Sequence, residues 1–427
     1  MIRDNKAKSS ADNRRNSSYY KSKVKSPRNK ASNNFFENSR RRQMNSYIKA
    51  IAVVSVLMLV VTGFIMLGVL LQNLTAEEIE SAYPPRLSEP APSIFQLGDD
   101  EQIEAPAYIP DIFYRFQGIY LDVRQLEDLD DLQTFIYRVK LRDINAVRIT
   151  IKRDDGVIPF RIGGRFVPLA GEDNETDLRI QDIIEMLHDN GLYVSGKIAC
   201  FRDNRKSTHF PTWALTETAT GGRFSDAGDS SWLNIYSEDA RAYIKDLVAE
   251  SVLLGFDEII LDYFHLPNVS DISRIVYNDG GVSKSDAVRN FVTEVRAVID
   301  ENMPDYKNVR LGLNFQIHHL LNTGNIAPGN AMGINIDELI DLSDFFTTSF
   351  APDRLPEGAL GITNPAGNPY ETVRALGERF ADISGRIIFR PDLQALGSTD
   401  EQILSQRQAL AGTGISVWTL INYDNNY

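Results

Sequence analysis

The sequence predicts an α/β protein in which a (β/α)8 barrel, the TIM barrel architecture, follows a single N-terminal transmembrane helix. From residue 117 onward, eight short apolar runs alternate with amphipathic stretches, as in a parallel barrel rather than an open doubly wound sheet. The long connections each follow the end of a predicted strand, where the loops of such barrels carry function. An uncharged apolar run near the N-terminus predicts the membrane helix.

The first 49 residues form a basic segment that we expect to be a disordered tail. They contain 14 Lys and Arg against 3 Asp and Glu, a net charge of +11, and few large apolar side chains. A basic tail can attract nucleic acid, but this one has neither a folded reader nor interleaved aromatic residues. We therefore expect no nucleic acid partner.

Residues 50–71 are 22 residues without a charge. At a rise of about 1.5 Å per residue, they span about 33 Å as a helix, enough to cross a bilayer. The run is flanked on its N-terminal side by Arg40, Arg41, Arg42 and Lys49, and positive charge stays on the cytoplasmic side. A cleaved signal peptide normally has a shorter apolar core, of about 7–15 residues. We expect an uncleaved single-pass anchor in the cell membrane, with the tail 1–49 cytoplasmic and the C-terminal domain extracellular.

An acidic region follows the anchor. Residues 72–427 carry 31 basic and 55 acidic side chains, a net charge of −24. Residues 72–112 form a Pro-rich extracellular linker, which should be semi-extended, and residues 113–427 form the barrel domain. Cys200 is the single cysteine of the chain, so the domain relies on its core rather than on an intrachain disulfide.

The barrel elements follow from apolar periodicity and helix-capping signals. The predicted strands are 118–123, 145–151, 192–199, 258–262, 309–315, 345–349, 386–389 and 415–421. The predicted helices are 128–140, 177–190, 238–254, 284–302, 369–381 and 399–411. Gly191 and Gly255 are C-cap signals for two of these helices. Few residues follow the eighth strand, so either the barrel lacks a last helix or the segment before Gln117 covers that face.

The fourth predicted strand ends in Asp262, which is followed by Tyr263, Phe264 and His265. The carboxyl ends of barrel strands carry the chemistry, whereas residues at the opposite end, such as Glu258, serve stability. Asp262 is therefore the leading catalytic candidate. The competing interpretation is that this aspartate only caps a helix or anchors a loop.

The long connections 152–176, 201–236, 263–282, 316–334 and 351–368 should together roof one pocket. They and the last strand hold polar and aromatic residues suited to sugar rings, which stack on flat aromatic faces. These residues are Asp203, Trp213, Trp232, His265, His318 and Trp418.

The domain resembles a bacterial family of uncharacterised, glycoside-hydrolase-like proteins that are exported or membrane-anchored and have a TIM barrel related in style to the α-amylase clan. The most specific motif is G-F-D-E-I-x-x-D-Y-x-x-x-P, present at 255–267. Further matching motifs lie in order along 117–427. They are Gly118-Ile-Tyr-Leu, Asn145-Ala-Val, Gly191-Leu-Tyr-Val, Lys197-Ile-Ala-Cys-Phe-Arg-Asp203, Asn364-Pro365, Pro369-Tyr370-Glu371, Arg390-Pro391-Asp392-Leu393-Gln394 and Trp418-Thr-Leu-Ile-Asn422.

The resemblance implies hydrolysis of O-glycosidic bonds in a polysaccharide, with Asp262 as the nucleophile. Cleavage usually needs a second carboxylate, and Asp203, Asp392 and Asp122 are the candidates in that order. The chain departs from the family pattern, because Thr150 and Asn314 stand where acids are expected. Lys197 and Arg148 lie on neighbouring strands and are the cations expected to pair with Asp262. The predicted substrate-binding residues are Lys197, Arg148, His265, Asn314, Trp232, Arg390, Trp418 and Asn422.

Other chemistries have no support in the sequence. The chain has no G-x-S-x-G elbow, P-loop, H-E-x-x-H or G-x-G fingerprint, which argues against esterase, nucleotide-binding and zinc-protease activities. His318 and His319 are adjacent and would point to opposite faces of a strand, so we expect no metal and no cofactor. Two functions remain open: a membrane-anchored glycoside hydrolase, and an inactive relative that binds a polysaccharide or cell-wall glycan.

External protease added to intact cells should remove the barrel domain and leave residues 1–49 protected, because the basic flank keeps the tail inside. Immunoblots against a tag at each end of the chain measure this. Digestion of the tail with protection of the barrel would contradict the predicted orientation.

Overall fold

The computed structural model describes residues 111–163, 175–269, 271–304, 307–317 and 332–422. The predicted tail, the transmembrane helix 50–71, nearly all of the linker and His318 lie outside these residues. None of the helices described is both apolar enough and long enough to span a membrane.

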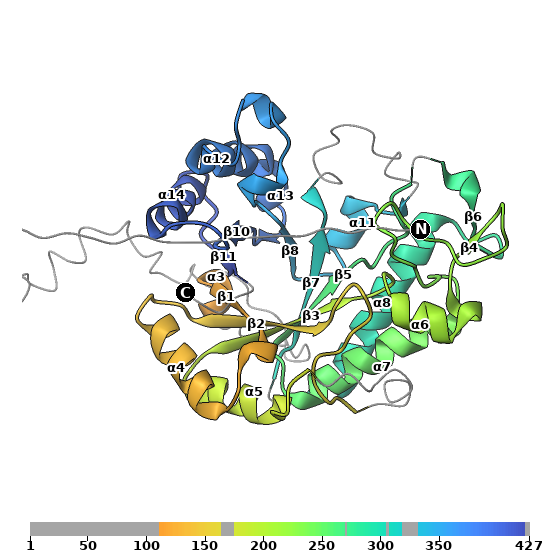
Figure 1. Ribbon diagram of the computed structural model, residues 1–427, viewed down its shortest axis with the longest axis horizontal. Helices are drawn as coiled ribbons and strands as arrows, with labels where there is room; N and C mark the ends of the chain where they lie inside the picture. Colours follow the sequence, from red (N-terminus) through yellow and green to blue (C-terminus); the bar gives the residue numbers. More distant parts are fainter. Residues whose placement is uncertain (1–110, 164–174, 270, 305–306, 318–331, 423–427) are drawn as a thin grey trace, which may run out of the picture. The chain divides into compact units, whose positions relative to one another are not determined.

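The centre of the domain is a curled parallel sheet surrounded by helices, an α/β arrangement consistent with a TIM-like barrel (Figure 1). Its strand order is β10-β11-β1-β2-β3-β5-β7-β8-β9, and all pairings between these strands are parallel. The strands are β1 Gln117–Leu121, β2 Ala146–Lys152, β3 Tyr193–Ala199, β5 Glu258–Asp262, β7 Arg310–Phe315, β8 Phe345–Thr348, β9 Ile388–Phe389, β10 Asp392–Gln394 and β11 Trp418–Ile421. Two further short strands, β4 (Thr216–Glu217) and β6 (Ile275–Val276), form a separate antiparallel pair.

The seventh predicted strand, 386–389, corresponds to β9, and a second short strand, β10, follows it in the sheet. Pro391 separates β9 from β10 and has no N–H to donate to a ladder. Before the break, the Arg390 N–H donates to the Phe346 carbonyl of β8; after it, the Thr419 N–H of β11 donates to the Pro391 carbonyl. Ser349 and Asp392 form a parallel bridge between the end of β8 and β10. The prediction of a single strand over 386–389 was therefore incomplete, because a proline interrupts the run.

The helices lie where the amphipathic stretches predicted them. Their bounds are α4 Leu129–Lys140, α5 Ile180–Asp189, α7 Glu238–Leu254, α8 Lys284–Asn302, α12 Pro369–Arg379 and α14 Asp400–Ala411. Shorter helices complete the domain: α3 Asp111–Tyr114, α6 Asn204–His209, α11 Ile336–Ile340 and α13 Ala381–Ser384. Side chains cap the N-termini of three long helices. Ser237 accepts from the Ala240 N–H at the start of α7, and Ser283 accepts from the Asp286 N–H at the start of α8. Thr399 forms a capping box with Gln402 at the start of α14. Gly255 ends α7 with φ of 102°, a conformation that favours glycine.

Alternation along the strands divides the core into two regions. Ile119, Val147, Ile149, Ile259 and Leu261 belong to the large apolar cluster that the strands share with the surrounding helices. The residues that alternate with them, such as Tyr120, Arg148 and Ile260, face the interior of the curled sheet. This interior is apolar only at the amino-terminal end of the strands and polar toward the other end.

The segment before β1 packs into that amino-terminal end. Phe113 of α3 is buried against Ile260 and Phe345, and Phe116 packs against Ala146 and Val417. The segment before Gln117 was predicted as one possible cover for the face left by a missing last helix. The structure shows a different position, because the segment covers the base of the sheet interior rather than the outer face where an eighth helix would lie.

Arg390, predicted to bind substrate, instead lies at this base. Its side chain is fully buried and donates from one nitrogen to both oxygens of Glu258, at 2.6 and 2.9 Å. The guanidinium lies 3.5 Å from the ring centroid of Phe116 and 4.1 Å from that of Phe345. The substrate-binding prediction was wrong for Arg390, because the chain turns at Pro391 and sends Arg390 and Asp392 to different levels of the interior.

Replacing Arg390 by Met should lower the free energy of unfolding by about 3–5 kcal/mol, since the Glu258 carboxylate would stay buried without its cation. Urea denaturation measures the loss. The double variant Glu258→Leu/Arg390→Met should recover most of it. Arg374→Met breaks an exposed pair with Glu378 and should leave the unfolding midpoint unchanged. Equal losses in Arg390→Met and Arg374→Met would contradict the assignment.

Candidate active site

A pocket of about 360 Å³ opens at the carboxyl ends of the strands. The residues that line it come from most strands of the sheet and from the connections after β5, β7 and β8. They are Tyr120, Arg148, Thr150, Lys197, Asp262, Tyr263, Asn314, Phe315, Gln316, Ile317, Ser349, Ala351, Asp353, Arg354, Asp392, Leu393, Gln394, Leu396 and Ile421. The long connections were predicted to roof one pocket, and those after β5, β7 and β8 contribute residues to it.

Asp262 ends β5 and presents its carboxylate to this pocket. Its Oδ2 lies 2.8 Å from the Lys197 Nζ, and its Oδ1 accepts from the Asn314 amide at 2.9 Å and from the Tyr263 N–H at 3.0 Å. All of these groups stabilise negative charge on the carboxylate. The expected pairing of Asp262 with Lys197 is present. Asn314, which stands where the family pattern has an acid, supplies a hydrogen-bond donor instead.

Arg148, the other predicted cation, pairs with Asp392 rather than with Asp262. One terminal nitrogen lies 2.5 Å from Asp392 Oδ1, and the other donates to the Thr419 hydroxyl at 2.9 Å. The Thr347 hydroxyl also donates to Asp392 Oδ1, at 3.3 Å. Arg148 is 1% exposed, so the pair is held within the interior of the sheet. Asp392 thus joins Asp262 in the pocket, each with its own cation.

A third carboxylate, Asp353, also lines the pocket and was not among the predicted site residues. It is exposed and lies in a short helical turn after β8, where its backbone N–H donates to Gln394 Oε1 at 3.2 Å. Its position in the long connection 351–368, which was expected to help roof the pocket, could have indicated it. Tyr120, Gln316 and Gln394 also line the pocket and were not predicted.

Asp203, the first candidate for the second acid, is absent from the pocket lining. It is fully buried as the N-cap of α6, where its Oδ1 accepts from the Lys206 N–H at 2.8 Å and its Oδ2 lies 2.9 Å from the Lys152 Nζ. Burial lowers the pKa of the neighbouring Lys206 to about 8, and the charge of Asp203 opposes that shift. The structure therefore corrects the prediction for Asp203, which is an internal anchor for the connection after β3.

Asp122, the third candidate, also lies outside the pocket lining. Its carboxylate caps a short helical turn after β1 and pairs with Arg124 at 2.5 Å. Two of the three candidates for the second acid are thus local structural groups. The role of cap or anchor, which was the competing interpretation for Asp262, describes Asp203 and Asp122.

Four predicted substrate-binding residues lie outside the pocket lining. Trp232 is buried and donates from Nε1 to Asp226 at 2.9 Å, and a ring nitrogen of buried His265 lies 2.7 Å from the Leu266 carbonyl. Trp418 is buried with Arg407 over its ring, and Asn422 is 6% exposed. Trp213, another aromatic expected in the pocket, stacks on Phe210. Trp213, Trp232 and His265 pack the connections after the strands, whereas Trp418 begins β11 at the amino-terminal end of the sheet and packs against Arg407 of α14.

No group of three or more His, Cys, Asp or Glu side chains in the described part of the chain is arranged to hold a metal ion. Two carboxylates of the pocket, Asp262 and Asp392, are instead paired with Lys197 and Arg148, and the lining also holds Asp353 and Arg354. This arrangement suits a neutral, hydroxyl-rich ligand, which can exchange hydrogen bonds with both charged partners.

Residues 118–427 match the family described as "Putative glycosyl hydrolase domain". The chain belongs to this family. The match confirms the resemblance predicted from the order of the motifs and covers the curled sheet and its helices. Among curated proteins, no sequence matches the chain.

This family member is also similar to several solved structures. A hypothetical protein from Ruminiclostridium thermocellum ATCC 27405 has 27% identity and a TM-score of 0.38, over 45% of this chain and 96% of that one. The catalytic domain of beta-amylase from Paenibacillus polymyxa has 10% identity and a TM-score of 0.48, over 73% of this chain and 92% of that one. The endo-beta-1,4-mannanase from Thermotoga petrophila has 12% identity and a TM-score of 0.46, over 72% and 67% respectively.

Asp203→Asn should lower the free energy of unfolding by about 3–5 kcal/mol, because Lys152 would remain buried without its counter-charge. Chemical denaturation measures the change, with Asp130→Asn on the exposed face of α4 as the control. If Asp203→Asn keeps the stability of the wild type and instead loses glycan binding or hydrolysis, Asp203 belongs to the functional site after all.

Proposed function

We propose that the domain is a glycoside hydrolase that acts on a polysaccharide and uses Asp262 as its nucleophile. The observation that carries the proposal is the setting of this carboxylate. It lies at a strand end inside the pocket, beside Lys197 and Asn314, which both stabilise its charge. An ionised carboxylate under a bound sugar can attack the anomeric carbon and oppose the positive charge of an oxocarbenium-like transition state.

A second carboxylate has to protonate the leaving oxygen. Asp392 is less free to reach a leaving oxygen, because its Oδ1 is already engaged by Arg148 and by the Thr347 hydroxyl. Asp353 is exposed at the pocket and forms no ion pair within the described residues. We therefore assign the proton donor to Asp353. In the retaining scheme, its proton passes to the leaving group as Asp262 bonds to the sugar. Water then attacks the anomeric carbon and breaks the bond to Asp262, and Asp353 takes back a proton from that water.

The alternative is a catalytically inactive relative that binds a glycan. The observation in its favour is that Arg148 and Lys197 each neutralise one of the two carboxylates deepest in the pocket. Such pairs offer donors and acceptors for sugar hydroxyls without supplying a proton donor.

We further propose that the domain is held at the outer face of the cell membrane by the predicted helix 50–71, with the tail 1–49 in the cytoplasm. Its partner there would be a polysaccharide or cell-wall glycan. The acidic balance of residues 72–427, a net charge of −24, is unfavourable for binding nucleic acid.

Asp262→Asn should reduce hydrolysis by several orders of magnitude and leave the fold and glycan affinity largely unchanged, because the lost charge matters mainly in the transition state. Release of reducing ends from soluble starch, galactomannan, xylan, mixed-linkage β-glucan and chitosan measures activity. Affinity electrophoresis in the same polysaccharides measures binding. Asp353→Asn should also reduce hydrolysis, and Asp130→Asn should have no effect.

Wild-type binding without hydrolysis, unchanged in Asp262→Asn, would favour the glycan-binding alternative. Loss of the folded state in Asp262→Asn would make Asp262 a structural anchor. Azide provides a further check: it should restore bond cleavage in Asp262→Ala by taking the place of the missing nucleophile, and it should have no such effect on Asp203→Ala.

A further inference from the structure

Tyr263 directly follows Asp262 and has a backbone conformation that is rare for a bulky residue. Its φ is 48°, in the left-handed region. Hydrogen bonds hold the backbone on both sides, because the Tyr263 N–H donates to Asp262 Oδ1 at 3.0 Å and the Phe201 N–H donates to the Tyr263 carbonyl at 3.0 Å. A strained residue that the surroundings hold in place is typical of a functional site. Here the strain turns the residue after the proposed nucleophile toward the pocket.

Two side chains from the connection after β3 hold the Tyr263 ring. The Arg202 guanidinium lies 5.3 Å from the ring centroid, and the Trp232 ring meets it nearly edge-on at 5.7 Å. The ring is only half-buried and lines the pocket. One part of the phenol is thus packed by protein, while another part remains available to a bound molecule.

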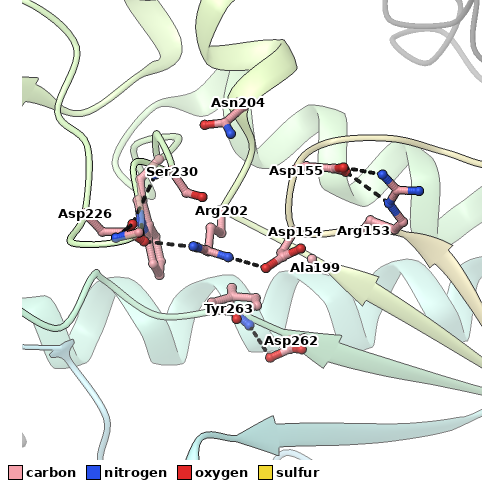
Figure 2. A network of polar contacts seen from close by, with 12 residues as sticks. Arg153, Asp154, Asp155, Ala199, Arg202, Asn204, Asp226, Ser230, Asp262 and Tyr263 are labelled. Atoms are coloured by element: carbon pink, nitrogen blue, oxygen red, sulfur yellow. Dashed lines mark hydrogen bonds and ion pairs between the residues drawn. The ribbon is translucent and has the colours of Figure 1, made fainter. Parts of the chain in front are cut away.

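Arg202 is itself held between two carboxylates from different loops (Figure 2). It pairs with Asp154, in the connection after β2, and its Nε donates to Asp226 Oδ2 at 2.9 Å. The same Asp226 oxygen accepts from Trp232 Nε1, and its Oδ1 accepts from the N–H groups of Gly228 and Ser230. Asp226 thereby fixes both groups that contact the ring.

We infer that Tyr263 is a substrate-orienting residue of the pocket, and that Arg202, clamped between Asp154 and Asp226, is a positioning residue that acts through it. The inference rests on the proposed function, because the molecule to be oriented is the sugar bound at Asp262. The phenol would donate a hydrogen bond to a sugar hydroxyl, and its ring face would limit how the sugar can tilt over the carboxylate.

The electrostatics agree with this role. Burial raises the pKa of Tyr263, and the negative charges of Asp262 and Asp154 raise it further. The phenol therefore keeps its proton at neutral pH and remains a donor. The pKa of Arg202 is also raised, since its hydrogen bond to Asp226 and the nearby negative charges outweigh the opposing effect of burial. Arg202 therefore also stays charged at neutral pH.

A double-mutant cycle on the hydrolase tests the inference, with the five polysaccharides named above as substrates. Tyr263→Phe should raise KM about fivefold to tenfold with a smaller change in kcat, because one hydrogen bond to the sugar is lost. Arg202→Gln should lower kcat/KM at least tenfold, and Arg202→Lys should recover part of that loss. In a Tyr263→Ala background, Arg202→Gln should cause no further loss, because Arg202 acts through the ring.

Arg153→Gln is the matched control. Arg153 belongs to the neighbouring charged group drawn in Figure 2 and pairs with Asp155 and Glu175, but no contact with Tyr263 is described for it. This variant should keep the kcat/KM of the wild type. Unfolding midpoints of all variants show whether a loss of activity reflects a loss of fold. If Tyr263→Ala does not fold, Tyr263→Gly replaces it, since glycine accepts the positive φ without strain.

Full additivity of Arg202→Gln and Tyr263→Ala would overturn the inference and make Arg202 a general loop anchor. Unchanged kcat and KM in Tyr263→Phe and in Arg202→Gln would overturn it while leaving the proposed hydrolase intact. If the wild type neither cleaves nor binds any of the five polysaccharides, the proposed function falls and the inference falls with it.

Discussion

The turn of the chain at Arg390 and Pro391 decides how the curled sheet continues from β8 to β11. Before the proline, the backbone pairs with β8; after it, the ladder passes to β11, and the bridge between Ser349 and Asp392 joins the two parts. The same turn sends the Arg390 side chain to the apolar base and the Asp392 side chain to the pocket. Both ends of the interior therefore depend on a short break in one strand.

The buried charges of the domain fall into two classes that the sequence does not distinguish. Glu258 with Arg390 and Lys152 with Asp203 are fully buried pairs, in which each charge has its partner and neither side chain is exposed. Lys197 with Asp262 and Arg148 with Asp392 are also ion pairs, but they line a pocket. Enclosed pairs hold elements together at a cost in desolvation, whereas pairs at a pocket can exchange their hydrogen bonds with a ligand. Both kinds of carboxylate are paired. A carboxylate is a candidate for function when its ion pair lines a pocket and is structural when the pair is enclosed.

The roof of the pocket has a similar division. Trp232 and His265 seemed suited to contact sugar rings, yet both are packed beneath the loops, and Trp232 contacts Tyr263, which does line the pocket. Indole rings bury a large apolar area, so loops that lack regular structure tend to use them as their own small core. The polar contacts of Asp226 then order the connection after β3 and keep it against the strand ends.

By itself, the sequence determined the order and bounds of the main elements, because apolar periodicity and caps are local properties. Strand 258–262 and helices 238–254 and 284–302 were predicted with the bounds that the structure has, and the position of Asp262 at a strand end followed from them. The short helix α11 and the break at Pro391 were missed, since a few residues carry too little periodicity. Only the tertiary structure decided which carboxylates join Asp262. Asp203 and Asp353 both lie in connections after strands, but the first turns inward to Lys152 and the second lies at the pocket. That choice depends on loop conformation and on partners distant in the sequence, which no local pattern encodes.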